Sequence, residues 1–171
     1  MSLGEMLRRW WLVGAIAVAL IALLVYVRSD RRRVHRALDR AENLMEKAGA
    51  EDQLSAFGNT RKLVALFAPG FLVRARPYEG AITDLQQLAA VIHRYRSGAT
   101  ALRISDRERK LELNRELGIA TLTFIADVDS DYGGSPGRAS YRIRIDWVRQ
   151  DGAWLIHDFE LVEVLAGRSW W

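Results

Sequence analysis

The last apolar segment of the chain, residues 153–165, holds a histidine next to acidic residues, in the order His157, Asp158 and Glu160. A histidine close to a carboxylate could act as a general base. The segment reads as a strand, however, and neighbouring side chains of a strand point to opposite faces. His157 and Asp158 therefore cannot line the same side of a pocket. His157 is expected to share its face with Leu155, Phe159 and Leu161, which favours a structural histidine in the core or at its edge.

Two further polar residues lie in a segment with helical periodicity, residues 83–98. His93 follows an apolar residue and precedes a basic stretch, which favours a position on the surface or at the boundary of the core. Asp84 lies at the start of the segment and could be read as a pocket acid. Its better explanation is a favourable interaction of its charge with the N-terminus of the helix.

The acidic run from Asp127 to Asp131 has the D-x-D-x-D spacing that begins a calcium-binding loop. Such a loop needs glycine at its sixth position and glutamate at its twelfth, and this chain has Tyr132 and Arg138 there. An EF-hand is therefore excluded. A weak cation site stays open as the alternative to acidic side chains that simply face water.

Other signatures of chemistry are missing from the sequence. The chain has no cysteine, and its three histidines are far apart, which excludes disulfides, thiolate metal sites and a cysteine nucleophile. Phosphate-binding, dinucleotide-binding, zinc-protease and serine-hydrolase motifs are also missing. From the residues alone we predict no catalytic, cofactor-binding or metal-ligating residue.

An apolar run near the N-terminus, residues 10–27, contains no charged residue, and the rest of the chain comes after it. As a helix it would span roughly 27 Å, close to the hydrocarbon thickness of a bilayer. A buried core helix would keep a polar stripe, and a signal peptide would be shorter and end in a cleavage site. We therefore predict an uncleaved transmembrane helix over residues 10–28. The predicted membrane-interface residues are the arginines and aromatic residues at its ends: Arg8, Arg9, Trp10, Trp11, Tyr26, Arg28, Arg31, Arg32 and Arg33.

The high pI of 9.7 comes from these membrane flanks. Residues 1–36 carry seven arginines against two acidic residues, and the rest of the chain carries 18 basic and 19 acidic residues. A nucleic-acid-binding domain needs a basic face of its own, so that class of function is excluded. The more basic flank follows the span, which predicts an inner-membrane protein with its domain in the cytoplasm rather than the periplasm. The opposite topology stays open, because Arg8 and Arg9 also resemble the start of a signal anchor.

The sequence divides into five parts. We predict an N-terminal flank (1–9), the transmembrane helix (10–28), a basic juxtamembrane helix (29–49), an α+β domain (50–166) and a tryptophan-rich tail (167–171). A heptad-like stripe in the juxtamembrane helix is too short for a coiled coil, so packing against its own domain is favoured.

Within the domain, helical and alternating patterns follow one another. A helix is predicted over residues 51–67, and its apolar, core-facing side is formed by Leu54, Phe57, Leu63, Val64 and Phe67. Another is predicted over 83–98, with Thr83 and Gln86 as a capping box. A short strand is predicted over 71–76, after which the period changes to two. The predicted alternating segments are 101–105, 110–114, 118–128, 139–149 and 153–165, with a loop over 130–137 and a hairpin turn at Asp151 and Gly152. This order predicts about three helices packed on a curved antiparallel sheet.

The closing hairpin, with Gly152-Ala153-Trp154-Leu155-Ile156, resembles the last strands of the NTF2-like superfamily, and the resemblance covers roughly residues 35–165. It implies a cone-shaped α+β fold with a deep pocket between helices and sheet. Some members are isomerases, dehydratases or hydrolases, others bind or scaffold, and some are membrane-tethered subunits of bacterial secretion systems. The isomerases need a carboxylate base with a tyrosine or acid partner, and no such pair can be assigned from this sequence.

The C-terminal Trp170 and Trp171 have no core to join, so we expect them to contact lipid or a partner. The leading hypothesis is a non-catalytic, membrane-anchored NTF2-like scaffold subunit of a larger membrane complex. Its expected partners are the lipid bilayer and other subunits, and homo-oligomerisation is left open. The alternative is a tethered isomerase, dehydratase or hydrolase, or a binder of a small apolar ligand. That alternative fails if side chains such as Phe124, Trp147 and Phe159 fill the cone.

Overall fold

The structure is a computed structural model that describes residues 16, 18, 30–76 and 80–167. Within these residues, no helix is both long enough and apolar enough to cross a membrane. The predicted span lies outside the described residues except for Ile16 and Val18, which are helical. The predicted interface residues before position 29, and the tryptophans of the tail, also lie outside them.

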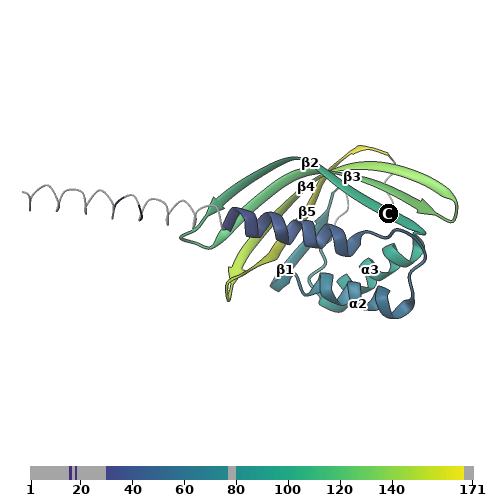
Figure 1. The fold of residues 1–171 in the computed structure, drawn as a ribbon, viewed down its shortest axis with the longest axis horizontal. Helices are drawn as coiled ribbons and strands as arrows, with labels where there is room; N and C mark the ends of the chain where they lie inside the picture. The colour runs from purple at the N-terminus through teal and green to yellow at the C-terminus, as the bar shows by residue number, and fades with distance from the viewer. Residues whose placement is uncertain (1–15, 17, 19–29, 77–79, 168–171) are drawn as a thin grey trace, which may run out of the picture.

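Three helices and five strands make up the described domain (Figure 1). The first helix covers residues 30–45 and lies along the inside of a curved sheet that arches over the helices. The other elements follow in the order α2 (Gln53–Val64), β1 (Phe67–Ala75), α3 (Leu85–Gly98), β2 (Ala101–Asn114), β3 (Ile119–Tyr132), β4 (Ser135–Gln150) and β5 (Ala153–Ala166). The α+β class with about three helices is as predicted.

The sheet is mixed, with the strand order β1-β5-β4-β3-β2. The last four strands form antiparallel hairpins, as predicted, but β1 pairs with β5 in parallel. The prediction of a purely antiparallel sheet was therefore wrong. Charged side chains also link the β1 segment to β5 on the outer face of the sheet. Arg74 donates a hydrogen bond to Asp158 at 2.6 Å, and Arg76 donates one to Glu160 at 2.9 Å.

Two of the hairpins close with two-residue turns in which both residues have positive φ. Asp151 and Gly152 have φ of 49° and 79°, as expected for the predicted turn. Gly133 and Gly134 have φ of 64° and 84° and form a second tight turn. The predicted loop over 130–137 was therefore wrong, because β3 and β4 continue almost to this turn.

The edge strand β2 is one strand where two short ones were predicted. A bulge between Arg107 and Lys110 shifts its register against β3, and Glu108 has a φ of 59°. The bulge explains why the alternation in the sequence breaks there. Bulges and inward-pointing charges also protect an edge strand from pairing with another chain.

The core lies between the first helix and the inner face of the sheet. Val34 and Leu38 of this helix are 0% and 2% exposed, so it packs against its own domain, as favoured above. The alternation in β4 is confirmed, and its inward residues are buried. These residues are Tyr141, Ile143, Ile145 and Trp147.

Asp52 and Asp84 cap the other two helices. The Asp52 carboxylate accepts from the Ser55 backbone N–H, and the Asp84 carboxylate accepts from that of Gln87. The predicted role of Asp84 at a helix N-terminus is confirmed. The predicted capping box beginning at Thr83 was wrong, because Asp84 holds the cap position one residue later.

Candidate interaction surfaces

The three side chains expected to fill the cone pack into the core of the domain. Phe124 and Trp147 are 3% and 0% exposed, and Phe159 packs against the same cluster. In the described part of the chain, the buried carboxylates are Asp30 and Glu160. Each faces arginine, Arg149 for Asp30 and Arg76 for Glu160. A pocket acid of the kind an NTF2-like isomerase needs is therefore not found among these buried carboxylates.

Two tyrosines meet beneath the sheet, where no sequence pattern singled them out. The rings of Tyr95 and Tyr132 lie 6.1 Å apart in an edge-to-face arrangement. Burial, together with a hydrogen bond to Tyr132, raises the pKa of Tyr95. Its hydroxyl therefore remains neutral at physiological pH and can donate a hydrogen bond, but it cannot serve as a base.

The structure separates the histidine and acids of β5. His157 is exposed and lies at a register shift, where Trp147 pairs with Ile156 and Asp146 with Asp158. The Asp158 carboxylate is held by Arg74 on the outer face. The prediction that His157 and Asp158 form no common site therefore agrees with the structure.

The register shift also changes which β5 residues face inward. Trp154 and Ile156 are buried before it, and Leu161 is buried after it. The expected grouping of His157 with Leu155, Phe159 and Leu161 on one face was wrong for this reason.

The acidic run that begins at Asp127 lies on β3 and its turn. Hydrogen bonds from Ser140 and Arg107 lower the pKa of Asp127. The Asp129 carboxylate pairs with Arg138 at 3.4 Å. The Asp131 carboxylate accepts a hydrogen bond from the Gly134 N–H at 2.8 Å. These acids belong to a strand and its turn, so their carboxylates already have protein partners. Across the described residues, no group of three potential ligands could hold a metal ion.

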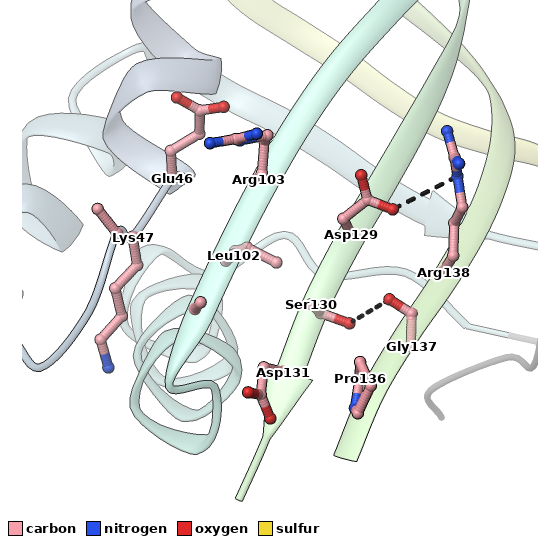
Figure 2. A pocket seen from close by; sticks show the side chains of 12 residues that line it. Glu46, Lys47, Leu102, Arg103, Asp129, Ser130, Asp131, Pro136, Gly137 and Arg138 are labelled. Carbon is pink, nitrogen blue, oxygen red and sulfur yellow. Dashed lines mark hydrogen bonds and ion pairs between the residues drawn. The ribbon is translucent and has the colours of Figure 1, made fainter. Parts of the chain in front are cut away.

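A surface groove of about 590 Å³ crosses β2, β3 and β4 at the end of the first helix (Figure 2). Figure 2 shows Glu46 beside Arg103 at one side and the ion pair of Asp129 with Arg138 at the other. Arg103, Asp129 and Arg138 are exposed. The groove alternates positive and negative groups, so it offers no net charge with which to select a ligand.

A denser charge cluster joins the first helix to β2. Arg109, beside the β2 bulge, lies 2.8 Å from Asp39 and 3.4 Å from Glu42, and it also pairs with Asp106. Burial, and then repulsion from Asp106, raises the pKa of Glu42 to about 7. The Oε1 atom of Glu42 is buried without a hydrogen-bond partner, which agrees with a carboxyl group that readily takes up a proton.

Among the residues that the structure describes, the most exposed large apolar side chains are on α2. Leu54 is 86% exposed and Phe57 is 70% exposed. Both were predicted to form the buried side of the helix, and that prediction was wrong. Thr60 and Leu63 are the buried residues of α2 instead.

The surroundings of this apolar face suit contact with another protein. His93 of α3 borders it, with its ring 6.4 Å from that of Phe57. Gly58 follows Phe57, and a Cβ added there would have nothing within 4 Å. A glycine inside a helix costs about 0.5–1 kcal/mol relative to alanine, and here it leaves room for close approach. We define the α2 face as Leu54, Phe57 and Gly58.

Comparison with known proteins identifies the fold. No protein-family model matches the sequence, and no curated protein does. A scytalone dehydratase-like protein from Novosphingobium aromaticivorans superposes with a TM-score of 0.69 at 13% identity, covering 84% of this chain and 89% of the other. An NTF2-like protein with a cystatin-like fold from the same species gives 0.65 at 15%, covering 84% and 88%.

A third similar structure is a calcium/calmodulin-dependent protein kinase II association-type domain from Xanthomonas campestris. It gives a TM-score of 0.61 at 17% identity, covering 75% of this chain and 84% of the other. The chain has an NTF2-like fold. At these identities the likeness concerns the fold alone, and this fold carries many functions.

One end of the NTF2-like domain gathers the residues next to the predicted span. Arg31, Arg32 and Arg33, predicted as interface residues, are exposed at the start of the first helix. Asp30 beside them is buried and lies 3.5 Å from Arg149. Figure 1 shows that the β2–β3 turn and the β4–β5 turn lie at this same end.

Proposed function

We propose that this protein is a non-catalytic, membrane-anchored interaction subunit of a bacterial membrane complex, with its NTF2-like domain in the cytoplasm. The anchor and its orientation are inferred from the apolar run and the basic flank that follows it. The domain presents the α2 face to a protein partner. Asp30, the first described residue of the domain, is two residues past the end of the predicted span.

The observation that carries the proposal is the exposure of Leu54 and Phe57, at 86% and 70%. Single exposed apolar residues are common on protein surfaces, but two large ones on one helical face, next to an unobstructed glycine, are typical of a contact site. Aromatic residues in such a setting often contribute most of the binding energy. The partner that fits is an apolar helical segment of another subunit.

The position of the α2 face supports this role. The first helix, about 24 Å long by its 16 residues, runs from the anchor-side end toward the opposite end of the domain. The chain then turns back into α2, which Figure 1 shows away from the anchor-side end. The anchor would therefore hold the α2 face clear of the bilayer and available to a partner.

The packed interior favours this function over a tethered enzyme. Trp147 and Phe124 are buried in the core between the helices and the sheet, where the resemblance leads us to expect the pocket of an NTF2-like enzyme. The raised pKa of Tyr95 keeps its hydroxyl protonated, and the two buried carboxylates of the described residues, Asp30 and Glu160, both pair with arginine. Binding at the surface therefore accounts for the features of the domain better than turnover in the cone.

Photo-crosslinking in native membranes tests the proposal. A photoreactive amino acid would replace Phe57 in the full chain, and the control would carry it at Glu112, an exposed residue of β2. We expect one discrete membrane protein to be captured from position 57, and the same protein to co-purify with the unmodified chain. Equal capture from both positions, or no capture from position 57, would contradict the proposal.

A further inference from the structure

The turn between β2 and β3 exposes apolar side chains at its tip. Leu117 is 69% exposed, and Ile119, the first residue of β3, is 44% exposed. The turn is held in shape by two hydrogen bonds. The Gly118 N–H donates to the Arg115 carbonyl at 3.2 Å, and the Leu117 N–H donates to the Asn114 side chain at 3.2 Å. The two apolar side chains are therefore displayed by an ordered turn.

This turn is joined directly to the start of the first helix. The Arg149 N–H donates to the Gly118 carbonyl at 2.8 Å. The Arg149 side chain lies 3.5 Å from the Asp30 carboxylate, and Arg115 of the turn lies 4.0 Å from it. Asp30 is 3% exposed in its side chain, so the carboxylate ties turn, strand end and helix together.

Chain length places this end close to the predicted bilayer. Two peptide units separate Asp30 from Arg28, the end of the predicted span, and two residues reach at most about 7 Å. The β2–β3 turn, tied to Asp30, is therefore within a short distance of the lipid headgroups. A partner protein would have to enter this narrow space, whereas the bilayer is already there.

The charges at this end agree with a lipid surface. Arg31, Arg32 and Arg33 are exposed there, and Arg115 and Arg149 are partly exposed. Glu116 and Asp151 are the exposed acids of the two turns. Arginines therefore outnumber acids, and basic groups beside exposed apolar side chains suit the interface of an anionic bilayer.

We propose that the β2–β3 turn is a second membrane contact, in which Leu117 and Ile119 enter the headgroup region of an anionic bilayer. This inference rests on the proposed anchor. A single spanning helix leaves the domain free to rotate about the helix axis. A second contact removes that freedom and fixes the direction in which the α2 face points.

The absence of cysteine from the sequence makes a direct test available. Leu117→Cys and Leu54→Cys variants of the full chain would each be labelled with an environment-sensitive fluorophore. Each would be reconstituted into vesicles of phosphatidylethanolamine and phosphatidylglycerol that carry a nitroxide quencher at the headgroup. Leu54 is the matched control because it is also a largely exposed leucine, on α2. We expect several-fold stronger quenching at position 117 than at position 54.

The outcomes separate this inference from the proposed anchor. A chain that does not float with the vesicles would overturn the anchor itself. A chain that floats, with the label at position 117 as little quenched as that at 54, would overturn the second contact and leave the anchor intact. A label at position 117 that is shielded in native membranes but not in lipid vesicles would assign the turn to a protein partner and would also overturn it.

Discussion

The carboxylate of Asp30 lies 3.5 Å from the guanidinium of Arg149, at the point where the chain enters the NTF2-like domain. Asp30 belongs to the first helix and Arg149 to the end of β4, 119 residues later. The pair thus fixes the entering helix to the sheet.

We predict that Asp30→Asn lowers the stability of the domain by about 1–3 kcal/mol, because Arg149 and Arg115 lose the buried carboxylate that faces them. Thermal unfolding of the detergent-solubilised chain would measure the change. Asp151→Asn is the control, since Asp151 is exposed and asparagine tolerates its positive φ. Equal effects of the two substitutions would show that the Asp30 pair does not stabilise the fold.

The buried ion pair of Arg96 with Glu51 provides a second prediction. Arg96 is 1% exposed. Its guanidinium donates to both carboxylate oxygens of Glu51, at 2.8 and 2.7 Å. It also donates to the Leu44 carbonyl at the end of the first helix. Removing the charge in Glu51→Gln leaves a buried cation, which costs about 3 kcal/mol. Glu163→Gln breaks the exposed pair with Arg142 and should cost less than about 1 kcal/mol. Urea denaturation would measure the free energy of unfolding of the two variants. A similar loss of stability in both would show that the buried pair of Arg96 with Glu51 stabilises the fold no more than an exposed pair does.

Glu42 makes the stability of the domain depend on pH. Its pKa in the fold, about 7, is above its ordinary value of 4.5. The fold therefore favours the protonated form, and the stability it contributes is lost as pH rises through 7. Between pH 6.5 and 8 we expect the wild-type chain to lose about 1 kcal/mol.

The matched variant for this prediction is Glu42→Gln, which resembles the protonated carboxyl at every pH. Its stability should change less than that of the wild type over the same interval. The interval lies above the ordinary pKa of His35, whose own pKa is lowered by burial and by Arg109, so this histidine contributes little to the slope. Parallel pH profiles for wild type and variant would rule Glu42 out as the source.

The C-terminal tryptophans give a prediction about attachment. Trp170 and Trp171 follow the described domain, and we expect them to contact lipid or a partner. Deleting both should weaken co-purification of partner subunits or flotation with lipid vesicles. If both measurements are unchanged by the deletion, the tail has no such role.

The parts of the fold that could be predicted are those with local signals. The alternation of Tyr141, Ile143, Ile145 and Trp147 identified β4 and its inward face, and Asp151-Gly152 identified the last turn, because both patterns report backbone geometry directly. The resemblance carried by residues 152–156 predicted the fold. The parallel pairing of β1 had no local signal, since the charged side chains that join it to β5, Arg74 and Asp158, are 84 positions apart.

The candidate sites were harder to predict, for a different reason. Hydrophobic periodicity assumes that apolar residues are buried, so Leu54 and Phe57 were assigned to the core although they face solvent. The register shift at His157 depends on the pairing of β5 with β4, and no pattern in the sequence of β5 indicates it. The cluster of Glu42 with Arg109 joins residues 67 positions apart. Contacts of this kind follow from the assembled fold alone.

The proposed membership in a membrane complex can be tested by a gentle-detergent pull-down from native membranes, followed by mass spectrometry, on three forms of the full chain. These are the wild type, the double variant Leu54→Gln with Phe57→Gln, and the control Leu165→Gln at another exposed leucine. We expect a stoichiometric membrane complex with the wild type and the control, and its loss with the double variant. A wild-type chain that migrates alone, or a complex that the double variant retains in full, would contradict the proposal.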